Sequence, residues 1–549
     1  MNVIESIQQH FIQHLIATLS LDPIIAQETR LTLNSDPSRQ EFGDLNANSA
    51  LVFAKQLKRK PREIAEQITK TYSNDLVRSI EIAGPGFLNF YFSPHAISLL
   101  ARQVYENGDL FFKPINLARQ SISLEFVSAN PTGPLHFGHG RGGIIGDVLG
   151  TILSFLGHHV TKEFYINDAG NQIAKLGESF KIRCQQLAGM NINLPEDGYQ
   201  GEYLVTLAQE FMDQHDGKAL LDQPDELFQS YAMNKLLENI RTTLTEYGIN
   251  FDTWFSEKTL HTSGAITKTL KYLAAHDYLY EKDGAVWFAA TRFGDDKDRV
   301  IQKQSGEFTY VAADIAYMVN KVSRGCSQMI MVLGHDHHGY VERLQGIRKA
   351  LNLSPELHII LYQLVNIKED GQQLRLSKRA GRIITLEDVI KTVGKDVARF
   401  FYLNRNADTQ LEFDLALALT KSEENPVYYI QYAYVRTGSI LQKASAIPSL
   451  DNLSAHDALE VSTEEVILLK KIVFLKELLE LISVTNQTHQ LAHYTYELAQ
   501  LFSTYYAKHR VIDPGNIPLS RGRLFMVQLI RNTLQTCFNL LGISQPERM

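Results

Sequence analysis

The sequence predicts a three-part α/β protein: a central domain built on a parallel β-sheet, preceded by a small α+β domain and followed by an all-α helix bundle. Three observations predict this arrangement. The chain has 549 residues, 44% of them hydrophobic, which is enough for three or four domains with a core in each. A strand, a glycine-rich loop, a helix and a strand follow one another from residue 121. After about residue 405 we find long helical patterns and no convincing strand.

Residues 1–115 are predicted to form the α+β domain. Three segments have helical spacing of apolar residues or a helix-starting proline: Ile4–Leu19, Leu45–Leu57 and the segment that begins at Pro61. Two short strands are expected on either side of a Gly-Pro-Gly turn: Ser79–Ala83 and Phe87–Phe92. The domain is expected to end in a linker around Phe111–Arg119.

Residues 116–404 are predicted to form the central domain. Its first half has a strand, a helix and a second strand: Ile122–Val127, Gly142–Leu156 and Val160–Ile166. This βαβ order implies a parallel sheet. Polar, helical sequence then occupies about 170–250, and strand patterns return at Ala285–Ala289 and Met329–Leu333. We therefore expect an insertion between the two halves of this domain.

Residues 405–549 are predicted to form the helix bundle. Four long helical patterns follow one another: Val427–Ala444, Thr463–Thr485, Gln490–Lys508 and Leu519–Leu541. From Leu501 to the end there are six basic residues and two acidic ones. The helical spacing of four aromatic residues indicates that most of them pack in the core: Tyr494, Phe502, Tyr505 and Tyr506.

Composition excludes several classes of protein. The three cysteines, Cys184, Cys326 and Cys537, are more than a hundred residues apart, which excludes a disulfide framework and a CxxC metal motif. No stretch approaches the ~20 apolar residues of a membrane span, and the N-terminus does not have the pattern of a secretory signal. We therefore expect a cytoplasmic protein without a membrane partner. The net charge of −7 leaves room for a local basic surface.

The densest chemical signal is the segment Glu125–Gly143, a strand that leads through a loop to the start of a helix. Free backbone N–H groups and the helix dipole make such a position attractive to phosphate. Gly138 would let a flat base lie against the backbone, and two imidazoles three residues apart, His136 and His139, could donate hydrogen bonds to a triphosphate. Taken alone, two histidines beside glycines are often incidental.

A rival interpretation uses the same residues. Gly138-x-Gly140-x-x-Gly143 matches the dinucleotide-binding fingerprint, and Glu163 follows 20 residues after the last glycine. In that fold the first glycine comes almost directly after the strand, whereas here about ten residues with two prolines intervene. The histidines would also have no role, so we favour the phosphate interpretation.

The second signal is the basic turn Arg375-Leu-Ser377-Lys378-Arg379-Ala-Gly381. A lysine on a glycine-flanked loop can bring positive charge to a polyphosphate when the ligand is bound. In isolation, such a run is usually a solvated surface. No GxxxxGK[ST] sequence occurs, so a Walker-type phosphate site is excluded.

At these two motifs the chain resembles the class I aminoacyl-tRNA synthetases. His136-Phe-Gly-His139 is similar to the HIGH signature of that class and Arg375-Leu-Ser-Lys-Arg379 to its KMSKS signature, with Arg375 preserving a cation. Within the class the chain resembles the arginyl-tRNA synthetases, from Glu41–Asp44 to the last four residues. The segments that carry this resemblance are Glu125–Gly142, Phe251–Glu257, Thr309–Tyr317, Gly334–Tyr340 and Asn425–Tyr432.

The resemblance implies a class I, Rossmann-like catalytic domain and a set of site residues. The HIGH region would comprise Ala129, Asn130, Pro131, Thr132, Gly133, Pro134, Leu135, His136, Phe137, Gly138 and His139. ATP would be bound by Pro131, His136, Gly138, His139, Ser377 and Lys378, of which His136, His139 and Lys378 would be catalytic. L-Arginine would be bound by Glu125, Ser128, Asn130, Tyr310 and Asp314. A planar guanidinium needs carboxylates that accept paired N–H bonds, although spacing alone would make Asp314 an acid on a helix surface.

The resemblance also implies the partners: L-arginine, ATP with Mg²⁺, and tRNA-Arg. The bundle would bind the anticodon and the N-terminal domain the outer corner of the tRNA, and the enzyme would need tRNA in order to activate arginine. We expect a monomer. His335-Asp-His-His338 could suggest zinc, but four adjacent residues at a strand end cannot all reach one ion, so we expect no protein-bound metal.

Two alternatives from other classes remain. A nucleotidylyltransferase shares the HxGH pattern but would not need a helix bundle of about 140 residues. A catalytically silent, tRNA-binding relative would keep the bundle and lose signature residues. His136, His139 and Lys378 are all present, which weighs against a silent protein.

Overall fold

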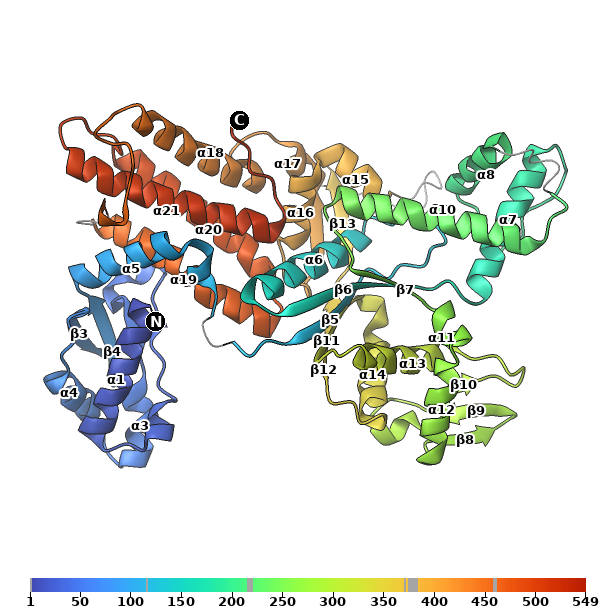
Figure 1. Ribbon diagram of the computed structural model, residues 1–549, viewed down its shortest axis with the longest axis horizontal. Helices are drawn as coiled ribbons and strands as arrows, with labels where there is room; N and C mark the ends of the chain where they lie inside the picture. The colour runs from blue at the N-terminus through green and yellow to red at the C-terminus, as the bar shows by residue number, and fades with distance from the viewer. Residues whose placement is uncertain (1, 115–116, 215–220, 370–371, 374–383, 458–461) are drawn as a thin grey trace.

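The computed structural model describes residues 2–114, 117–214, 221–369, 372–373, 384–457 and 462–549. Figure 1 shows a central sheet with the helix bundle and the N-terminal domain on one side and a group of inserted helices on the other. This arrangement confirms the predicted α/β class with its α+β and all-α companions. Within the described part of the chain, no helix combines the length and the apolar character needed to cross a membrane.

The N-terminal domain packs helices against a four-stranded antiparallel sheet of order β1-β2-β4-β3. Its strands are β1 (Thr32–Leu33), β2 (Leu45–Ala47), β3 (Val77–Ala83) and β4 (Phe87–Phe92). Its main helices are α1 (Val3–Leu19), α3 (Ser49–Leu57), α4 (Pro61–Thr71) and α5 (Pro94–Asn107), with the short α2 (Pro23–Ala26).

Two predictions for this domain are wrong in part. The helix expected over Leu45–Leu57 begins only at Ser49, because Leu45 and Ala47 alternate with Asn46 as buried positions of β2 and pair with β4. The expected linker around Phe111–Arg119 begins later, because Phe111 and Phe112 are buried in a short 3-10 helix.

The central domain contains a five-stranded parallel sheet of order β12-β11-β5-β6-β7. The strands are β5 (Ser121–Phe126), β6 (His159–Ile166), β7 (Thr253–Ser256), β11 (Gln328–Gly334) and β12 (Glu356–Tyr362). Figure 1 shows α6 (His139–Leu156) above this sheet and α13 (Tyr310–Ser323) and α14 (His338–Ala350) below it. The strand order reverses between β5 and β11, which is where ligands bind in open α/β sheets.

The strand predicted at Ala285–Ala289 exists but does not join the parallel sheet. It is β9 (Ala285–Phe288), in an antiparallel sheet with β8 (Leu279–Lys282) and β10 (Arg299–Gln302). Two helices precede this sheet: α11 (Lys258–Thr262) and α12 (Ala265–Ala275). The alternation of apolar and polar residues over four positions does not reveal which strand β9 pairs with. In the structure, a hairpin brings β8 beside β9.

In the described part of the chain, three helices are inserted between β6 and β7: α7 (Asn171–Leu187), α8 (Glu202–Gln214) and α10 (Asp225–Glu246). They enclose a core of their own, which includes Phe180, Phe211 and Phe228. In Figure 1 these helices project to the right of the sheet.

One strand occurs where the sequence suggests helices only. β15 (Leu411–Asp414) pairs in parallel with β13 (Val365–Glu369), which also pairs with β14 (Gln372–Gln373). The helices around it are α15 (Leu386–Val393), α16 (Lys395–Leu403) and α17 (Leu415–Leu419). The absence of strands expected after residue 405 is therefore wrong, because this four-residue strand is defined by a partner more than forty residues away.

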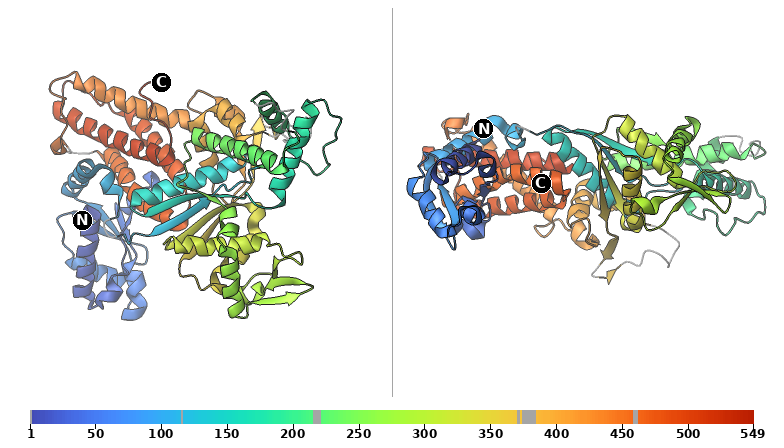
Figure 2. Two further views of the ribbon diagram at one scale, coloured as in Figure 1. Left: turned by 45° about the vertical axis from the view of Figure 1, so that its right-hand side comes forward. Right: turned by 90° about the horizontal axis from the view of Figure 1, so that it is seen from below.

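The bundle consists of α18 (Pro426–Ser445), α19 (Thr463–Thr485), α20 (His489–Lys508) and α21 (Ile517–Leu541). Tyr494, Phe502 and Tyr505 are buried, as predicted, whereas Tyr506 is exposed. The views in Figure 2 show the bundle packed against both the N-terminal domain and the central domain. Lys470 on α19 forms a buried ion pair with Asp44, 2.9 Å apart, at the first of these contacts.

Candidate active site

The loop between β5 and α6 begins with an unusual turn. Val127 and Ser128 have φ angles of 65° and 40°, a left-handed conformation that a β-branched residue rarely adopts. Hydrogen bonds hold the turn: Ser128 Oγ donates to Glu125 Oε1 over 3.1 Å and accepts from the backbone N–H of Tyr165 over 3.0 Å. Strained backbone held in this way is a feature of binding sites.

The two histidines of the loop are held in one tautomer. The backbone N–H of Gly138 donates to His136 Nδ1 over 3.1 Å, and that of His136 donates to His139 Nδ1 over 3.0 Å. Burial lowers the pKa of both imidazoles, that of His139 to about 4, so both are neutral near pH 7. A neutral ring that accepts at Nδ1 carries its proton on Nε2. Both rings therefore present an Nε2–H donor beside the start of α6, where phosphate is favoured.

Neighbouring elements hold the loop from both sides. From the inserted helices, the Tyr203 hydroxyl donates to the carbonyl oxygen of Thr132 over 2.6 Å. On the other side, Leu386 N–H donates to the Leu135 carbonyl over 2.8 Å and the Tyr402 hydroxyl to the Phe137 carbonyl over 2.7 Å. Such a loop is preorganised before any ligand binds.

The second predicted motif, Arg375–Gly381 with Ser377 and Lys378, lies outside the described residues. The structure describes the chain again from Ile384. Phe137 N–H donates to the carbonyl of Ile384 over 3.2 Å, and Thr385 forms a bridge with His136. The segment that follows the basic motif therefore lies against the histidine loop.

A cleft of about 850 Å³ opens beside this loop, a size that suits a nucleotide. Its lining combines the loop (Ala129, Asn130, Thr132–His136 and His139), the insertion between β6 and β7 (among its residues Tyr199, Tyr203 and Asn239) and the residues after the basic motif (Thr385, Glu387 and Asp388). Two predicted ATP ligands, Pro131 and Gly138, do not line it.

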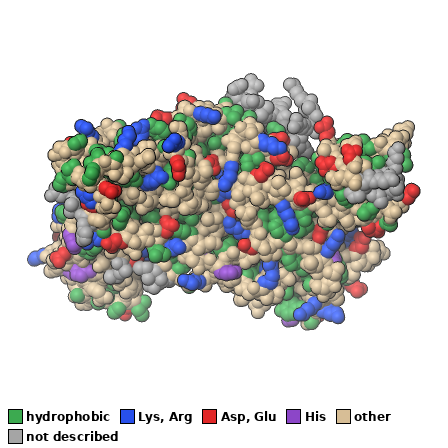
Figure 3. Space-filling view, turned by 45° about the horizontal axis from the view of Figure 1, so that its top comes forward, with side chains coloured by type: hydrophobic (Ala, Val, Ile, Leu, Met, Phe, Trp, Pro, Cys, Tyr) green, Lys and Arg blue, Asp and Glu red, His purple; other side chains and the backbone are tan. Residues whose placement is uncertain are grey.

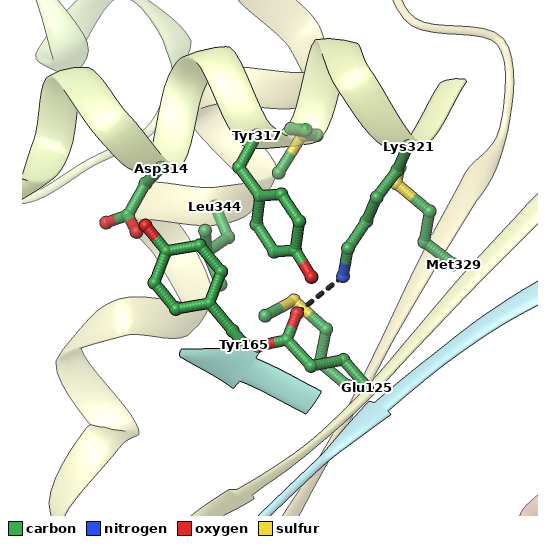
Figure 4. Close-up of a pocket in the computed structure, with 9 residues that line it drawn as sticks. Glu125, Tyr165, Asp314, Tyr317, Lys321, Met329 and Leu344 are labelled. Carbon is green, nitrogen blue, oxygen red and sulfur yellow. Dashed lines mark hydrogen bonds and ion pairs between the residues drawn. The ribbon is translucent and has the colours of Figure 1, made fainter. Parts of the chain in front are cut away.

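A second, smaller cavity of about 50 Å³ lies beneath the sheet, and Figure 4 shows most of its walls. It is lined by Glu125, Tyr165, Asp314, Tyr317, Met318, Lys321, Met329, Met331 and Leu344. Of the five predicted arginine ligands, Glu125 and Asp314 lie here, whereas Ser128 bonds to Glu125 and Asn130 lines the larger cleft. Tyr310 lines neither cavity, and the residue is 47% exposed.

Asp314 differs from the acid on a helix surface that spacing alone suggests. Within the described structure its Oδ2 atom is buried and has no hydrogen-bond partner. Burial, reinforced by the negative charge of Glu125, raises the pKa of Asp314 to about 7. A buried carboxylate oxygen without a partner is costly, so this position favours a cationic ligand.

Sequence reasoning missed the cations around these acids. Lys321 Nζ lies 2.5 Å from Glu125 Oε2, and Arg324 pairs with Glu163. The signal that could have found Lys321 is its spacing from Asp314, seven residues or about two helical turns, which places both on one face of α13. Because Glu163 is buried and paired, it cannot bind a ribose, and the dinucleotide interpretation is wrong.

The run His335–His338 does not gather around one point. His335 Nδ1 lies 3.0 Å from Nε2 of Gln363, which lies between β12 and β13. His337 Nε2 lies 3.8 Å from Oδ2 of the adjacent Asp336. Over the described ranges, no three histidine, cysteine or acidic side chains are grouped so that they could hold a metal ion.

Three family models match successive parts of this chain. Residues 5–92 match the family described as arginyl tRNA synthetase N terminal domain, residues 103–415 match tRNA synthetases class I (R), catalytic domain, and residues 430–549 match DALR anticodon binding domain. The arginine–tRNA ligase of Caldanaerobacter subterraneus subsp. tengcongensis is 41% identical over 525 residues, 94% of this chain and 93% of that protein. The chain belongs to the arginyl-tRNA synthetase family.

Further relatives agree with this chain in sequence and in fold. The arginine–tRNA ligase of Syntrophotalea carbinolica is 42% identical over 526 residues, 93% of this chain and 94% of that protein. The solved arginyl-tRNA synthetase of Thermus thermophilus, 20% identical, superimposes over 100% of both chains with a TM-score of 0.71 and supports the fold. The resemblance inferred from the two motifs is thus confirmed at the level of the family.

Proposed function

We propose that this synthetase joins L-arginine to the 3′ end of tRNA-Arg. Arginine and ATP first form arginyl-adenylate and release pyrophosphate, and the terminal ribose of the tRNA then attacks the mixed anhydride and releases AMP. The observation that carries the choice of arginine is the buried, unpartnered carboxylate oxygen of Asp314, which suits a planar cation. Family membership supports the reaction itself.

In this proposal the chain positions the reactants and stabilises charge, and no protein nucleophile takes part. The Nε2–H groups of His136 and His139 donate hydrogen bonds to ATP phosphate oxygens, together with the start of α6. Lys378 adds a positive charge from the basic motif. Asn130 holds the amino and carboxylate end of arginine, and Mg²⁺ enters with ATP, held mainly by phosphates and water.

For tRNA, the bundle offers a basic groove. Four basic side chains, Arg436, Lys443, Lys508 and Arg510, line a hollow of about 520 Å³ together with the exposed Tyr506. Figure 3 shows several Lys and Arg side chains over this part of the molecule. Cations contact phosphates and aromatic rings stack on unpaired bases, so the groove suits the anticodon loop. We place the enzyme in the cytoplasm as a monomer; its three free cysteines suit a reducing compartment.

The phosphate assignments are tested by His139→Ala and Lys378→Ala. Each change should slow arginine-dependent ATP–pyrophosphate exchange, measured with tRNA present, by roughly 10²–10³, the scale for removing one preorganised donor. Binding of tRNA should change little. If both variants exchange pyrophosphate at a rate within threefold of the parent protein, the assignment of these residues to phosphate binding is wrong.

A further inference from the structure

The first turn of α6 contains a buried arginine that no step of the proposed function uses. Arg141 lies two residues after His139 and is fully buried, with 0% of its surface exposed. Its guanidinium group donates one hydrogen bond to the carbonyl oxygen of Gln363 over 2.8 Å and another to that of Asn406 over 2.7 Å. One side chain thus joins α6 to two segments that lie 222 and 265 residues further along the chain.

The start of α6 is an unfavourable place for this cation. Both acceptors are neutral carbonyl groups, and within the described structure the Nε–H group of Arg141 is buried without a partner. Burial lowers the pKa of Arg141 to about 10, so the side chain is still charged near pH 7. The first turn of a helix disfavours positive charge, and burial of a cation without a counter-ion is costly. An arginine at this position therefore points to the property that distinguishes it, a planar fork that can hold two carbonyl groups at once.

The two carbonyl groups belong to segments that lead into one small sheet. Gln363 lies two residues before β13, and Asn406 lies five residues before β15. The segments also bond to each other, because Gln363 N–H donates to the carbonyl of Ala407 over 2.8 Å and Leu411 N–H donates to that of Leu364 over 3.1 Å. β13 then pairs with β15 on one side and with β14 on the other. Arg141 therefore fixes the beginning of the sheet β14-β13-β15 to α6.

This sheet comes directly before the basic motif in the sequence. β14 ends at Gln373, and the motif begins at Arg375. After the motif, the carbonyl of Ile384 accepts a hydrogen bond from the backbone N–H of Phe137 in the histidine loop. The chain thus enters the motif from the sheet and leaves it at the histidine loop. Arg141 connects that sheet to the helix that begins where the histidine loop ends.

We propose that Arg141 is a positioning residue: it holds the sheet β14-β13-β15 at a fixed place relative to His139, so that the basic motif starts from a fixed point beside the histidine loop. This inference rests on the proposed function, because it takes His139 and Lys378 as the groups that stabilise charge on the phosphates of ATP. Groups on separate segments act together only at the correct separation, and a misplacement of about 1 Å can slow a reaction roughly 10²-fold.

A double-mutant cycle with Lys378 tests the proposal, with arginine-dependent ATP–pyrophosphate exchange by the full chain measured at saturating tRNA-Arg. Arg141→Met should lower kcat roughly 10–100-fold and leave the KM for arginine within about twofold of the parent value. The KM should hold because the cavity assigned to arginine lies beneath the central sheet, whereas α6 lies above it. In the Lys378→Ala background, Arg141→Met should cost less than about threefold, since the group that it misplaces is already absent.

Arg348→Met is the matched control. The Nε–H group of Arg348 also donates to a main-chain carbonyl, that of Pro355 over 2.6 Å, but at the N-terminal end of β12, the opposite end from Gln363. This change should leave kcat within about twofold of the parent value. A purely structural role of Arg141 would slow exchange by the same factor with and without Lys378, so the cycle separates positioning from general support of the fold.

Equal losses from Arg141→Met in the two backgrounds would overturn the proposal. Parental exchange in Arg141→Lys would also overturn it, because lysine keeps the charge and lacks the planar fork. If Arg141→Met does not fold, the same cycle with Arg141→Lys decides, and failure of both variants to fold would assign Arg141 to the fold as a whole and overturn the positioning role. Parental exchange in Lys378→Ala would overturn the phosphate assignment of the proposed function as well. A slow Lys378→Ala variant with equal losses from Arg141→Met would overturn this inference alone.

Discussion

Single residues divide the chemistry between two cavities. His136 and His139 lie at the larger cleft, where the backbone fixes each as a neutral Nε2–H donor. Asp314 lies in the smaller cavity, where its buried Oδ2 atom has no hydrogen-bond partner among the described residues and, in our proposal, binds a cation. Substitutions can therefore test phosphate binding and selection of the amino-acid side chain separately. A substitution in one cavity should leave the function that we assign to the other cavity measurable.

Asp314→Asn tests the selection of the cation. The change keeps the shape of the side chain and removes its charge, so it should weaken arginine by about 2–5 kcal/mol in kcat/KM for aminoacylation. Inhibition of the reaction by citrulline should weaken far less, because a neutral ligand loses no ion pair. Equal losses for arginine and citrulline would show that Asp314 does not face the side chain.

The raised pKa of Asp314 predicts how arginine binding depends on pH. Because the pKa rises from 3.8 to about 7 on folding, the folded protein holds a proton that the unfolded chain releases, and the free protein loses stability as pH rises between these values. In our proposal arginine binds the protein in which Asp314 is ionised, and this binding offsets the loss of folding stability. The rise in Tm caused by saturating arginine should therefore be larger at pH 8 than at pH 6, and in Asp314→Asn it should be small and equal at both. A larger shift at pH 6 in the parent protein would contradict this account.

At the scale of elements, the loop before α6 is positioned by segments far away in the sequence. The inserted helices reach it through Tyr203, and α16 reaches it through Tyr402. The ring of Tyr203 also lies close to Gly133, where an added Cβ atom would come within 3.3 Å of it. A movement of the inserted helices would therefore act directly on the loop that we propose binds ATP.

Tyr203→Phe tests this connection. The ring still packs against the loop, but the hydrogen bond to Thr132 is lost, which should cost about 1 kcal/mol and raise the KM for ATP several-fold. Steady-state pyrophosphate exchange with tRNA present measures the change. Tyr231→Phe, at a partly buried position that packs against the core of the same inserted helices, is the matched control and should leave the KM unchanged. A similar rise in both variants would mean that the hydroxyl of Tyr203 has no special role.

The sequence predicts the bundle helices to within two residues at each end, because local signals mark their limits: Pro426 and Pro518 lie in first turns, and Ser462 with Glu465 forms a capping box. The histidine loop is likewise found from its motif. Short strands such as β2 and β15 are missed or misplaced, since a distant partner defines them. Lys321 is missed for the same reason: its partner Glu125 lies 196 residues away in the sequence.

At the scale of the whole molecule, one buried arginine connects the central domain, the chain after the inserted helices and the bundle. Arg399 on α16 pairs with Asp147 on α6 over 2.7 Å, and donates to the carbonyl of Tyr247, after the inserted helices, over 2.8 Å and to that of Leu541, at the end of α21, over 2.7 Å. α19 and α21 also pack on α6. The bundle that we assign to tRNA is thus in direct contact with the helix that begins at His139.

The resemblance to arginyl-tRNA synthetases implies that the first reaction step needs tRNA, and this contact offers a physical route for that control. ATP–pyrophosphate exchange with arginine should be near background without tRNA and appear when tRNA-Arg is added, because binding energy at the bundle can assemble the distant catalytic groups. Deleting the bundle after Asn404 should abolish that stimulation, but it would also uncover α6, so a tRNA without its anticodon arm is the cleaner probe and should stimulate less. Robust exchange by the full chain without tRNA would refute the coupling and leave the arginine assignment standing.

The central claim is that this chain charges tRNA with arginine and with no other amino acid. The most direct test incubates the full chain with ATP, Mg²⁺ and total tRNA and measures the attachment of each of the twenty radiolabelled amino acids. The account predicts acid-precipitable product with arginine alone, and loss of most of that product in Asp314→Asn at the same arginine concentration. Charging with another amino acid at a comparable rate, or arginine charging that Asp314→Asn leaves intact, would contradict it.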